Sequence, residues 1–514
     1  MVVLAGLAGF AGAALTVAIC GMPTPQIHDE FSYLLAARTY ALGRLTNPPH
    51  PMWPWLETFH TLSRPTYMSR YPPAPGAFLA LGILAQLPIL GVWLSTALAC
   101  AAVAWMLLCW LPPRWSLGGA VLLAFHPTML GWAHSFWGGS VAVLGGALTV
   151  GAARRLIDRA NAIDAILLGA GVVILAMSRP FEGAVFVGAL LVVALSMRLL
   201  RVRPLVPAMI VVAAGALFTL YDNWRVTGRP LLMPYALYER QYNFTPPLIV
   251  LPTHPVALRS AQMRQITMSW AYDQYAEKRT PLGFLAAIPK TLVIMVNGAF
   301  AFVPDAQLVR EPDPVRGMAL SLFAIVQELL VLAPLFLLPV LIRRDRLLRG
   351  LTIVLAAVFF LALLPAVAPL PHYAAPAVGV FVLLWMTCLR ELIARGWRAR
   401  TVISAVVAVW LFGCIFFFHE YRRWPLRWDE VRQRQDIERD FTARPGKHVL
   451  LVRYAIQHNP HFEWVQNGPD IDKQKVVWVH DLGDNAPLLR YYRDRDAWLV
   501  TAGYGPATLR KVAP

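Results

Sequence analysis

The stretch His28-Asp29-Glu30-Phe31-Ser32-Tyr33 follows directly after the first apolar segment, residues 1–22. Carboxylates are scarce in this chain, with 29 Asp and Glu among 514 residues, so an acidic pair at the end of an apolar segment calls for an explanation. One explanation is a helix N-cap, in which Asp29 accepts hydrogen bonds from backbone N–H groups and the helix dipole favours Glu30. The other is a general base at a membrane surface. The local sequence leaves both open.

The composition around this stretch is that of a membrane protein. Hydrophobic residues make up 57% of the chain and charged residues only 15%, which is too few charges to cover the surface of a soluble chain of this length. Long apolar runs recur almost to the end and predict a polytopic bundle of transmembrane helices. The formal net charge of +17 is explained by basic cytoplasmic loops, and the sequence carries no nucleic-acid-binding motif. We therefore expect membrane lipids, and no nucleic acid, among the partners.

The acidic pair opens a polar loop that runs through residues 23–72. Apolar residues recur at helical spacing between Phe31 and Leu42, which predicts a short amphipathic helix that Gly43 ends. The prolines that follow forbid a regular helix around Trp53, and tryptophan suits a membrane–water interface. We expect this loop to lie on the bilayer surface.

Clusters of arginine mark the loops that should face the cytoplasm. They include Arg154 and Arg155, Arg343 and Arg344, and Arg398 and Arg400. Their alternation with polar stretches predicts about eleven crossings, and a count of apolar pieces gives nearer thirteen, at about 20 residues per helix. Residues 285–303 then make no net crossing or are re-entrant. The N-terminus is expected inside, as an uncleaved span because no basic region precedes it, and the tail outside.

These patterns divide the chain into a transmembrane module, residues 1–419, and a soluble periplasmic tail domain, residues 420–514. Two large outer loops, 23–72 and 223–284, interrupt the module. The tail is charged and lacks long apolar runs, and its alternating segments predict a small α/β domain with a core of its own. The expected strands are residues 448–454, 475–479 and 498–501.

The second outer loop is rich in aromatic residues. They are Tyr235, Tyr238, Tyr242, Trp270, Tyr272 and Tyr275. Such residues can stack on sugars or anchor a loop at the interface, and the pattern favours the anchoring role.

The ionisable residues expected on the outer side form a mixed set of carboxylates, imidazoles and guanidinium groups. They are Asp29, Glu30, Glu57, His60, Arg64, Arg70, His134, Arg179, Glu182, His372 and Tyr373. A channel more often carries rings of one charge, and a transporter places polar residues near mid-membrane within internal repeats. The mixed set better fits a site that binds a phosphate through Arg and removes a proton with Asp. A transporter or lipid flippase, and a non-catalytic scaffold, remain as alternatives.

Several members of this set also have a purely structural interpretation. Arg70 could anchor its loop at the lipid headgroups. Arg179 and Glu182 could form an ion pair across one helical turn. His372 and Tyr373 could simply begin a helix that follows a proline.

Two parts of the first outer loop resemble a known family. The stretch 28–33 followed by Gly43, and the closure Arg70-Tyr71-Pro72-Pro73 about 40 residues on, resemble the first outer loop of the GT-C membrane glycosyltransferases. The similarity is to the branch that holds the protein O-mannosyltransferases and the lipid A aminoarabinose transferase, a bacterial glycosyltransferase-39-like family. Residues 178–183 and 371–376 are similar to segments of bacterial members.

The resemblance implies transfer of a sugar from a polyprenyl-phosphate carrier to an envelope glycan, lipid or protein, on the periplasmic face of the bacterial inner membrane. It assigns Asp29 as the general base at the acceptor nucleophile, with inversion at the anomeric carbon, and gives Glu30 a supporting role. The family's closing motif has Glu-Lys where this chain has Arg70 and Tyr71, so we expect Arg70 to supply the cation for the lipid phosphate. The remaining expected substrate-binding residues are Tyr71, His28, Arg179, Glu182, His372 and Tyr373.

The sequence predicts no metal site and no cofactor. His458 and His461 in the tail have HxxH spacing, but no third ligand is evident. The five cysteines lie in apolar segments without metal-site spacing. Some GT-C relatives use a divalent metal, but no second acidic cluster stands out here.

Overall fold

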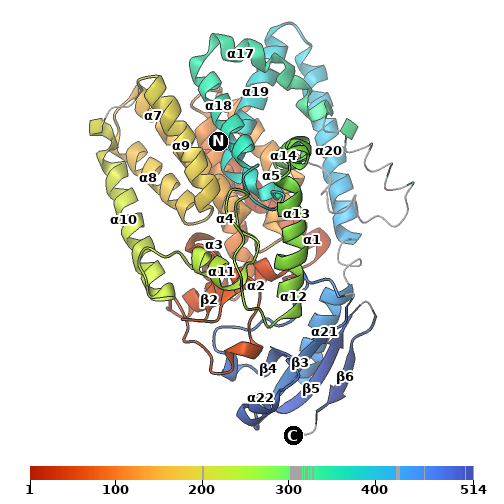
Figure 1. The fold of residues 1–514 in the computed structure, drawn as a ribbon. Coiled ribbons are helices and arrows are strands. Elements are labelled where there is room, and N and C mark those ends of the chain that lie inside the picture. The colour runs from red at the N-terminus through yellow and green to blue at the C-terminus, as the bar shows by residue number, and fades with distance from the viewer. Residues whose placement is uncertain are drawn as a thin grey trace. The chain divides into compact units, whose positions relative to one another are not determined.

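The fold is given by a computed structural model. It describes residues 1–199, 202–300, 329–423, 429–456, 458–503 and 505–512, together with positions 315, 318, 322, 325 and 326. The chain is mainly helical, with a small sheet near the C-terminus (Figure 1). It forms two compact units, each assembled from three segments. Unit 1 comprises Met1–Pro23, Ile89–Leu217 and Pro281–Arg422; unit 2 comprises Thr24–Pro88, Phe218–Thr280 and Arg423–Pro514.

Unit 1 is a bundle of apolar helices. Its elements are α1 (Val2–Cys20), α4 (Pro88–Leu107), α5 (Pro113–Ala124), α6 (Pro127–Ala133), α7 (Gly139–Asp158), α8 (Ala162–Ala176), α9 (Pro180–Ser196), most of α10 (Val202–Thr227), α14 (Pro281–Phe300), η3 (Ala333–Leu337), α17 (Leu338–Arg344), α18 (Arg346–Leu361), η4 (Pro371–Ala377), α19 (Val378–Ala394) and α20 (Ala399–Arg423). Proline begins several of them, where its missing N–H costs nothing. Asp345 caps α18 by accepting from the backbone N–H groups of Leu347 and Leu348.

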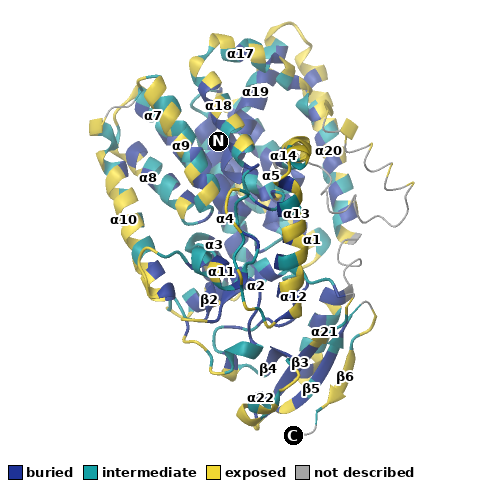
Figure 2. Cartoon of the chain, viewed as in Figure 1, coloured by how far each residue is buried: buried dark blue, intermediate teal, exposed yellow. Residues whose placement is uncertain are grey.

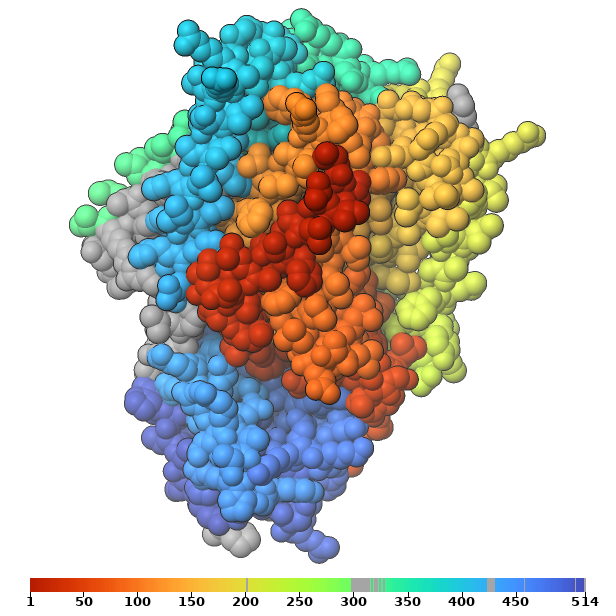
Figure 3. Space-filling view, turned by 180° about the vertical axis from the view of Figure 1, so that it is seen from behind, coloured from red at the N-terminus to blue at the C-terminus, as the bar shows by residue number. Residues whose placement is uncertain are grey.

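The interior of unit 1 is built around the helices α7 and α19, most of whose residues are buried (Figure 2). Gly146 lets α7 approach η4 closely, because a Cβ there would stand 1.9 Å from the carbonyl oxygen of Pro376. On the face shown in Figure 3, α1 lies against α5 and α6. By contrast α10 exposes large apolar side chains such as Met209 and Ile210, as expected of a helix surface that lipid covers.

The chain is a multi-pass membrane protein. Within the described ranges, six helices are long and apolar enough to cross a membrane, namely α1, α4, α7, α10, η4 with α19, and α20. A seventh is formed if Ala261–Lys278 and Pro281–Val296, bent by 103° at their junction, count as one span. This bent pair includes part of the segment for which the sequence predicts no net crossing. The count is below the predicted eleven to thirteen because α3, α8 and α9 are shorter apolar helices, and because most of residues 301–328 lie outside the described part.

Unit 2 combines both outer loops with the tail. From the first loop come α2 (His28–Ala41), η1 (Trp53–Trp55), β1 (Thr61–Leu62) and β2 (Met68–Ser69), and α3 (Pro73–Leu84) follows the loop. From the second come α11 (Pro234–Tyr242), α12 (Ala261–Gln265), the π-helical turn η2 (Ile266–Trp270) and α13 (Ala271–Lys278). The tail adds α21 (Asp429–Ala443), β3 (His448–Tyr454), η6 (Ile471–Lys473), β4 (Val476–His480), α22 (Ala486–Tyr491), β5 (Asp496–Ala502) and β6 (Thr508–Lys511).

The tail sheet confirms the predicted α/β domain. Its strand order is β4-β3-β5-β6, with β3 parallel to both neighbours and β6 antiparallel to β5. Side chains of β3 alternate between two buried clusters, as the two-residue period of a strand requires. Val449 packs in a cluster that includes Leu35 of α2 and Tyr67, whereas Leu450 packs with Phe441 of α21. One face of the sheet is therefore covered jointly by the first outer loop, through Leu35 and Tyr67, and by tail residues such as Leu488 of α22.

Candidate active site

Asp29 lies in the first turn of α2, surrounded by three side chains of unit 2. Its Oδ2 is 2.9 Å from Nδ1 of His28, and its Oδ1 is 3.7 Å from Nε2 of His60. The hydroxyl of Tyr71 donates a hydrogen bond to Oδ1. The side chain of Asp29 remains 24% exposed, so the carboxylate is not fully enclosed.

The hairpin of β1 and β2 brings two of these neighbours to α2. Thr61 pairs with Ser69 and Leu62 with Met68, so His60 precedes the hairpin and Tyr71 follows it. The hydroxyl of Ser32, on α2, lies 2.6 Å from the carbonyl oxygen of His60 and 2.7 Å from the hydroxyl of Ser69. This one side chain therefore joins both ends of the hairpin to the helix that carries Asp29.

His60 has a left-handed backbone conformation, with φ 59°. This region is sparsely populated by residues other than glycine, and it persists only where the surrounding structure holds it. Two hydrogen bonds stabilise this conformation of His60. The hydroxyl of Ser32 and the backbone N–H of Arg70 both donate to the carbonyl oxygen of His60.

The electrostatics of the group favour an ionised Asp29. Burial works to raise the pKa of Asp29, but His60, His28 and the hydrogen bond from Tyr71 outweigh it and hold that pKa well below its usual value. For His60, burial and the positive charge of Arg70 together lower the pKa well below its usual value, against the opposing effect of Asp29. Near neutral pH the carboxylate is charged and can accept a proton.

The two explanations for the acidic pair apply to different residues. Glu30 is the capping residue: its Oε2 accepts from the backbone N–H of Gln26 at 2.8 Å and of Ile27 at 3.4 Å, ahead of α2. Asp29 faces His28, His60 and Tyr71 instead. The helix also begins at His28, three residues before the predicted start, so the pair lies inside its first turn.

Arg70 is enclosed rather than anchored at a surface. Its Nη1 donates to Oε1 of Glu239 at 2.8 Å, and only 8% of the residue is exposed. Its guanidinium carbon lies 4.5 Å from the ring centre of Tyr235, 4.6 Å from that of Tyr238 and 5.2 Å from that of Tyr71. Two tyrosines of the aromatic second loop therefore pack against the cation of Arg70. The sequence had suggested sugar stacking or anchoring at the interface for these residues, and neither includes this role.

Four other predicted substrate-binding residues belong to unit 1 and form a group of their own. Arg179 is 4.0 Å from Glu182, as the ion-pair interpretation expects, and its guanidinium lies 5.8 Å from the ring of Tyr373. The ring centre of His372 is 4.9 Å from that of Trp137 and 5.1 Å from that of Tyr373. A shared site of these residues with Asp29 stays a prediction.

No protein-family model matches this sequence, and no curated protein matches it either. The fold, however, is similar to that of ArnT from Cupriavidus metallidurans bound to undecaprenyl phosphate, with TM-score 0.53 and 13% identity over 97% of this chain and 92% of that one. It is also similar to an oligosaccharyltransferase of Archaeoglobus fulgidus in complex with Zn and sulfate, with TM-score 0.52 and 12% identity over 96% of this chain and 67% of that one. The chain has the fold of the GT-C membrane glycosyltransferases. At this identity the likeness extends to the fold alone.

In this GT-C chain the tail contributes to the surroundings of Asp29, which the sequence did not predict. The ring of His461 lies 5.6 Å from that of His28 and 5.0 Å from that of Trp270. The only signal in the sequence was the HxxH motif, which by itself names no partner. His60 was among the outer-facing residues but had no assigned role.

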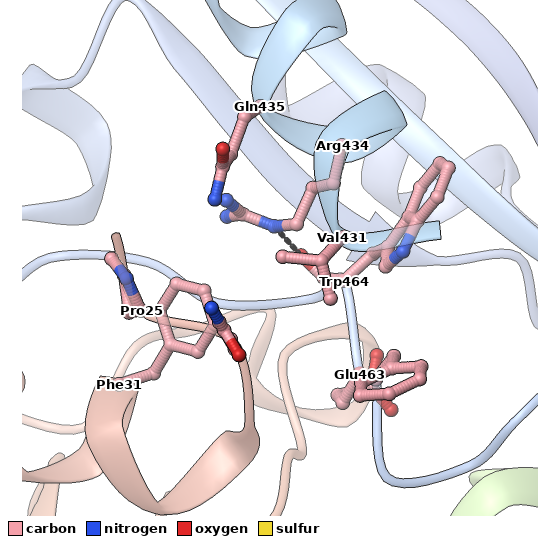
Figure 4. A pocket seen from close by; sticks show the side chains of 9 residues that line it. Pro25, Phe31, Val431, Arg434, Gln435, Glu463 and Trp464 are labelled. Atoms are coloured by element: carbon pink, nitrogen blue, oxygen red, sulfur yellow. Dashed lines mark hydrogen bonds between the residues drawn. The ribbon is translucent and has the colours of Figure 1, made fainter. Parts of the chain in front are cut away.

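A small hollow adjoins α2 on the same unit (Figure 4). It has about 210 Å³ of empty space, part of it open to solvent, between Phe31 on one side and Arg434 and Trp464 of the tail on the other. Arg434 is fixed there, because its Nε donates to the carbonyl oxygen of Trp464 at 2.9 Å. The hollow is too small for a drug-sized ligand.

Proposed function

We propose that this chain is a membrane glycosyltransferase that moves a sugar from a polyprenyl-phosphate carrier to a hydroxyl group of an envelope glycan, lipid or protein. The reaction takes place on the periplasmic face of the bacterial inner membrane, with the N-terminus in the cytoplasm and the tail in the periplasm. The observation that carries the proposal is the ionised, partly exposed Asp29, oriented by His28, His60 and Tyr71. The GT-C fold supports the class of reaction, and the ArnT neighbour was solved with a polyprenyl phosphate bound.

The proposed chemistry is a direct displacement. The acceptor oxygen attacks the anomeric carbon, the bond from that carbon to the phosphate oxygen breaks, and the configuration inverts. Asp29 takes the proton of the acceptor hydroxyl, an effect worth about 10²–10⁴-fold in rate. The lipid phosphate leaves as an anion and therefore needs positive charge rather than a proton. No nucleotide sugar and no cofactor enter this scheme.

Arg70 remains the proposed source of that positive charge. Its Nε has no hydrogen-bond partner within the described structure, while Nη1 is shared with Glu239. A bidentate phosphate contact would have to compete with Glu239 for the guanidinium. Glu30 supports Asp29 by capping the turn that carries it, and His28 and Tyr71 orient it. Arg179, Glu182, His372 and Tyr373 stay proposed substrate-binding residues.

Mass analysis of lipid-linked sugars and envelope glycans tests the proposal in cells with and without the gene. We expect the deletion to accumulate one lipid-linked sugar and to lose that sugar from one envelope component. Plasmid-borne Asp29→Asn should behave like the deletion. Asp158→Asn, which changes a carboxylate paired with Arg154 in unit 1, should restore the wild-type pattern. Full restoration by Asp29→Asn would overturn the base assignment, and unchanged glycans and lipids in the deletion would overturn the function.

A further inference from the structure

His28, Asp29 and His60 bring three metal-ligating atoms together. One imidazole nitrogen from each histidine and one carboxylate oxygen all lie within 4.8 Å of one another. Across the ranges that the structure describes, this is the one group of three or more such side chains with that spacing. The atoms come from the start of α2 and from the residue that precedes β1.

Each histidine of this group has a buried ring nitrogen without a hydrogen-bond partner in the described structure. The side chains of His28 and His60 are 8% and 14% exposed. Nε2 of His28 and Nδ1 of His60 have no hydrogen-bond partner in the described structure, whereas Nδ1 of His28 lies 2.9 Å from Asp29. A buried polar atom without a partner is costly and calls for an explanation. A bound cation that accepts the lone pair of one nitrogen from each ring provides an explanation, with the other ring nitrogen protonated.

The donor set selects the kind of ion. Magnesium and calcium prefer oxygen ligands, whereas imidazole suits zinc and its transition-metal neighbours. Two histidines and one carboxylate, with a fourth position open, form a set that zinc occupies in proteins. The 24% exposure of Asp29 leaves an entry path.

We propose that His28, Asp29 and His60 form a binding site for one divalent ion of the zinc class. The ion is not a cofactor of the proposed reaction. The consequence for activity rests on the proposed function. A bound ion takes up the carboxylate lone pair that Asp29 would otherwise offer to the proton of the acceptor hydroxyl. Zinc binding should therefore inhibit sugar transfer reversibly.

The binding experiment uses the full-length protein in nanodiscs, stripped with a chelator and then titrated with zinc chloride by calorimetry. We expect one zinc ion per chain, and at least a tenfold loss of affinity in His60→Asn and in His28→Asn. The matched control is His50→Asn, because His50 is also 2.9 Å from an aspartate, Asp472, but belongs to no group of three ligands. This control should bind zinc like the wild type. Magnesium chloride should neither bind at one equivalent nor displace zinc.

The inference is overturned if the wild type takes up no zinc at one equivalent, or if both histidine variants bind zinc as the wild type does. Thermal unfolding of each variant confirms that it is folded, and should one variant not fold, the other decides. A transfer assay with and without zinc, followed by chelator, tests the inhibition separately. Loss of activity that the chelator restores supports it, and unchanged activity at saturating zinc refutes it. If the proposed function is wrong, metal-free Asp29→Asn transfers sugar at the full rate. The calorimetry measures zinc binding whether or not this happens.

Discussion

Neighbouring carboxylates at the start of α2 show how strongly position within one helical turn decides a side chain's role. Glu30 reaches back to the backbone N–H groups of Gln26 and Ile27, directly ahead of the helix. Asp29, one residue earlier, points toward a hairpin that delivers His60 and Tyr71. The sequence identified the pair as important but could not divide the two roles, because the division depends on a hairpin about 30 residues away.

Glu30→Ala separates capping from catalysis. Loss of the cap should lower the free energy of unfolding by about 1 kcal/mol, a typical value for a lost cap. The rate of sugar transfer should decrease only in proportion to the loss of order in the turn that carries Asp29. Chemical denaturation and initial transfer rates in the same membranes check both. Unchanged stability with complete loss of transfer would show that Glu30 acts in the chemistry itself.

The ion pair of Arg70 and Glu239 offers a second test at this scale. Arg70→Met alone leaves a buried carboxylate without its partner, and we expect a loss of about 3–5 kcal/mol in stability. The double variant Arg70→Met/Glu239→Met removes both charges and should recover most of it. Because it keeps the fold, the double variant isolates the proposed phosphate contact.

Donor titrations of this double variant then decide the role of Arg70. A guanidinium that contacts the lipid phosphate predicts a KM for the donor raised at least tenfold, since a charged hydrogen bond contributes about 1.5–3 kcal/mol. An unchanged KM in a folded double variant would leave Arg70 a structural role only.

At the scale of elements, the hairpin β1–β2 is held to α2 by Ser32. The regular parts of this region were predictable: apolar spacing indicated the helix that ends near Gly43, and alternation indicated three of the four tail strands. The two-residue strands β1 and β2 were not, because their pairing is too short to leave a periodic pattern. Nor does any pattern show that His461 of the tail approaches His28, since periodicity gives the buried face of an element but not its partner.

Ser32→Ala tests this attachment. The change removes one hydroxyl that contacts both the carbonyl of His60 and the hydroxyl of Ser69. We expect a stability loss of about 1–2 kcal/mol and a larger proportional loss of transfer, because His60 and Tyr71 are then less well placed around Asp29. Ser196→Ala, at the end of α9, removes an exposed hydroxyl that donates to the carbonyl oxygen of Val193 in its own helix, and should change neither quantity measurably. Equal behaviour of the two variants would argue against a positioning role for Ser32.

At the scale of the whole molecule, the tail is part of the unit that carries Asp29. The sequence predicted a boundary near residue 420, because charge and hydropathy change there. Contacts also divide the chain close to that point, between Arg422 and Arg423, and they group the tail with both outer loops. Its sheet shares a buried cluster with Leu35, Leu56 and Tyr67. Composition could not reveal this, since the residues of a shared core look the same as those of a separate one.

Val479→Ala, in β4, tests the shared core. The cavity should lower the stability of the tail by about 1–3 kcal/mol. If the core is common, hydrogen exchange should also increase in α2 and around Tyr67, which pack in the same cluster. Trp478, next in sequence, packs on the opposite face with Phe441, so Trp478→Phe should loosen α21 more than α2. Faster exchange confined to the tail in Val479→Ala would show that the tail is independent.

The central claim is that the carboxylate of Asp29 accepts the acceptor's proton during sugar transfer. The most direct measurement is the single-turnover transfer rate of purified, metal-free Asp29→Asn in nanodiscs, with the lipid-linked sugar identified from deletion cells as donor. We predict a rate about 10²–10⁴-fold below wild type with donor binding retained. A folded Asp29→Asn that transfers sugar at the wild-type rate would contradict the account.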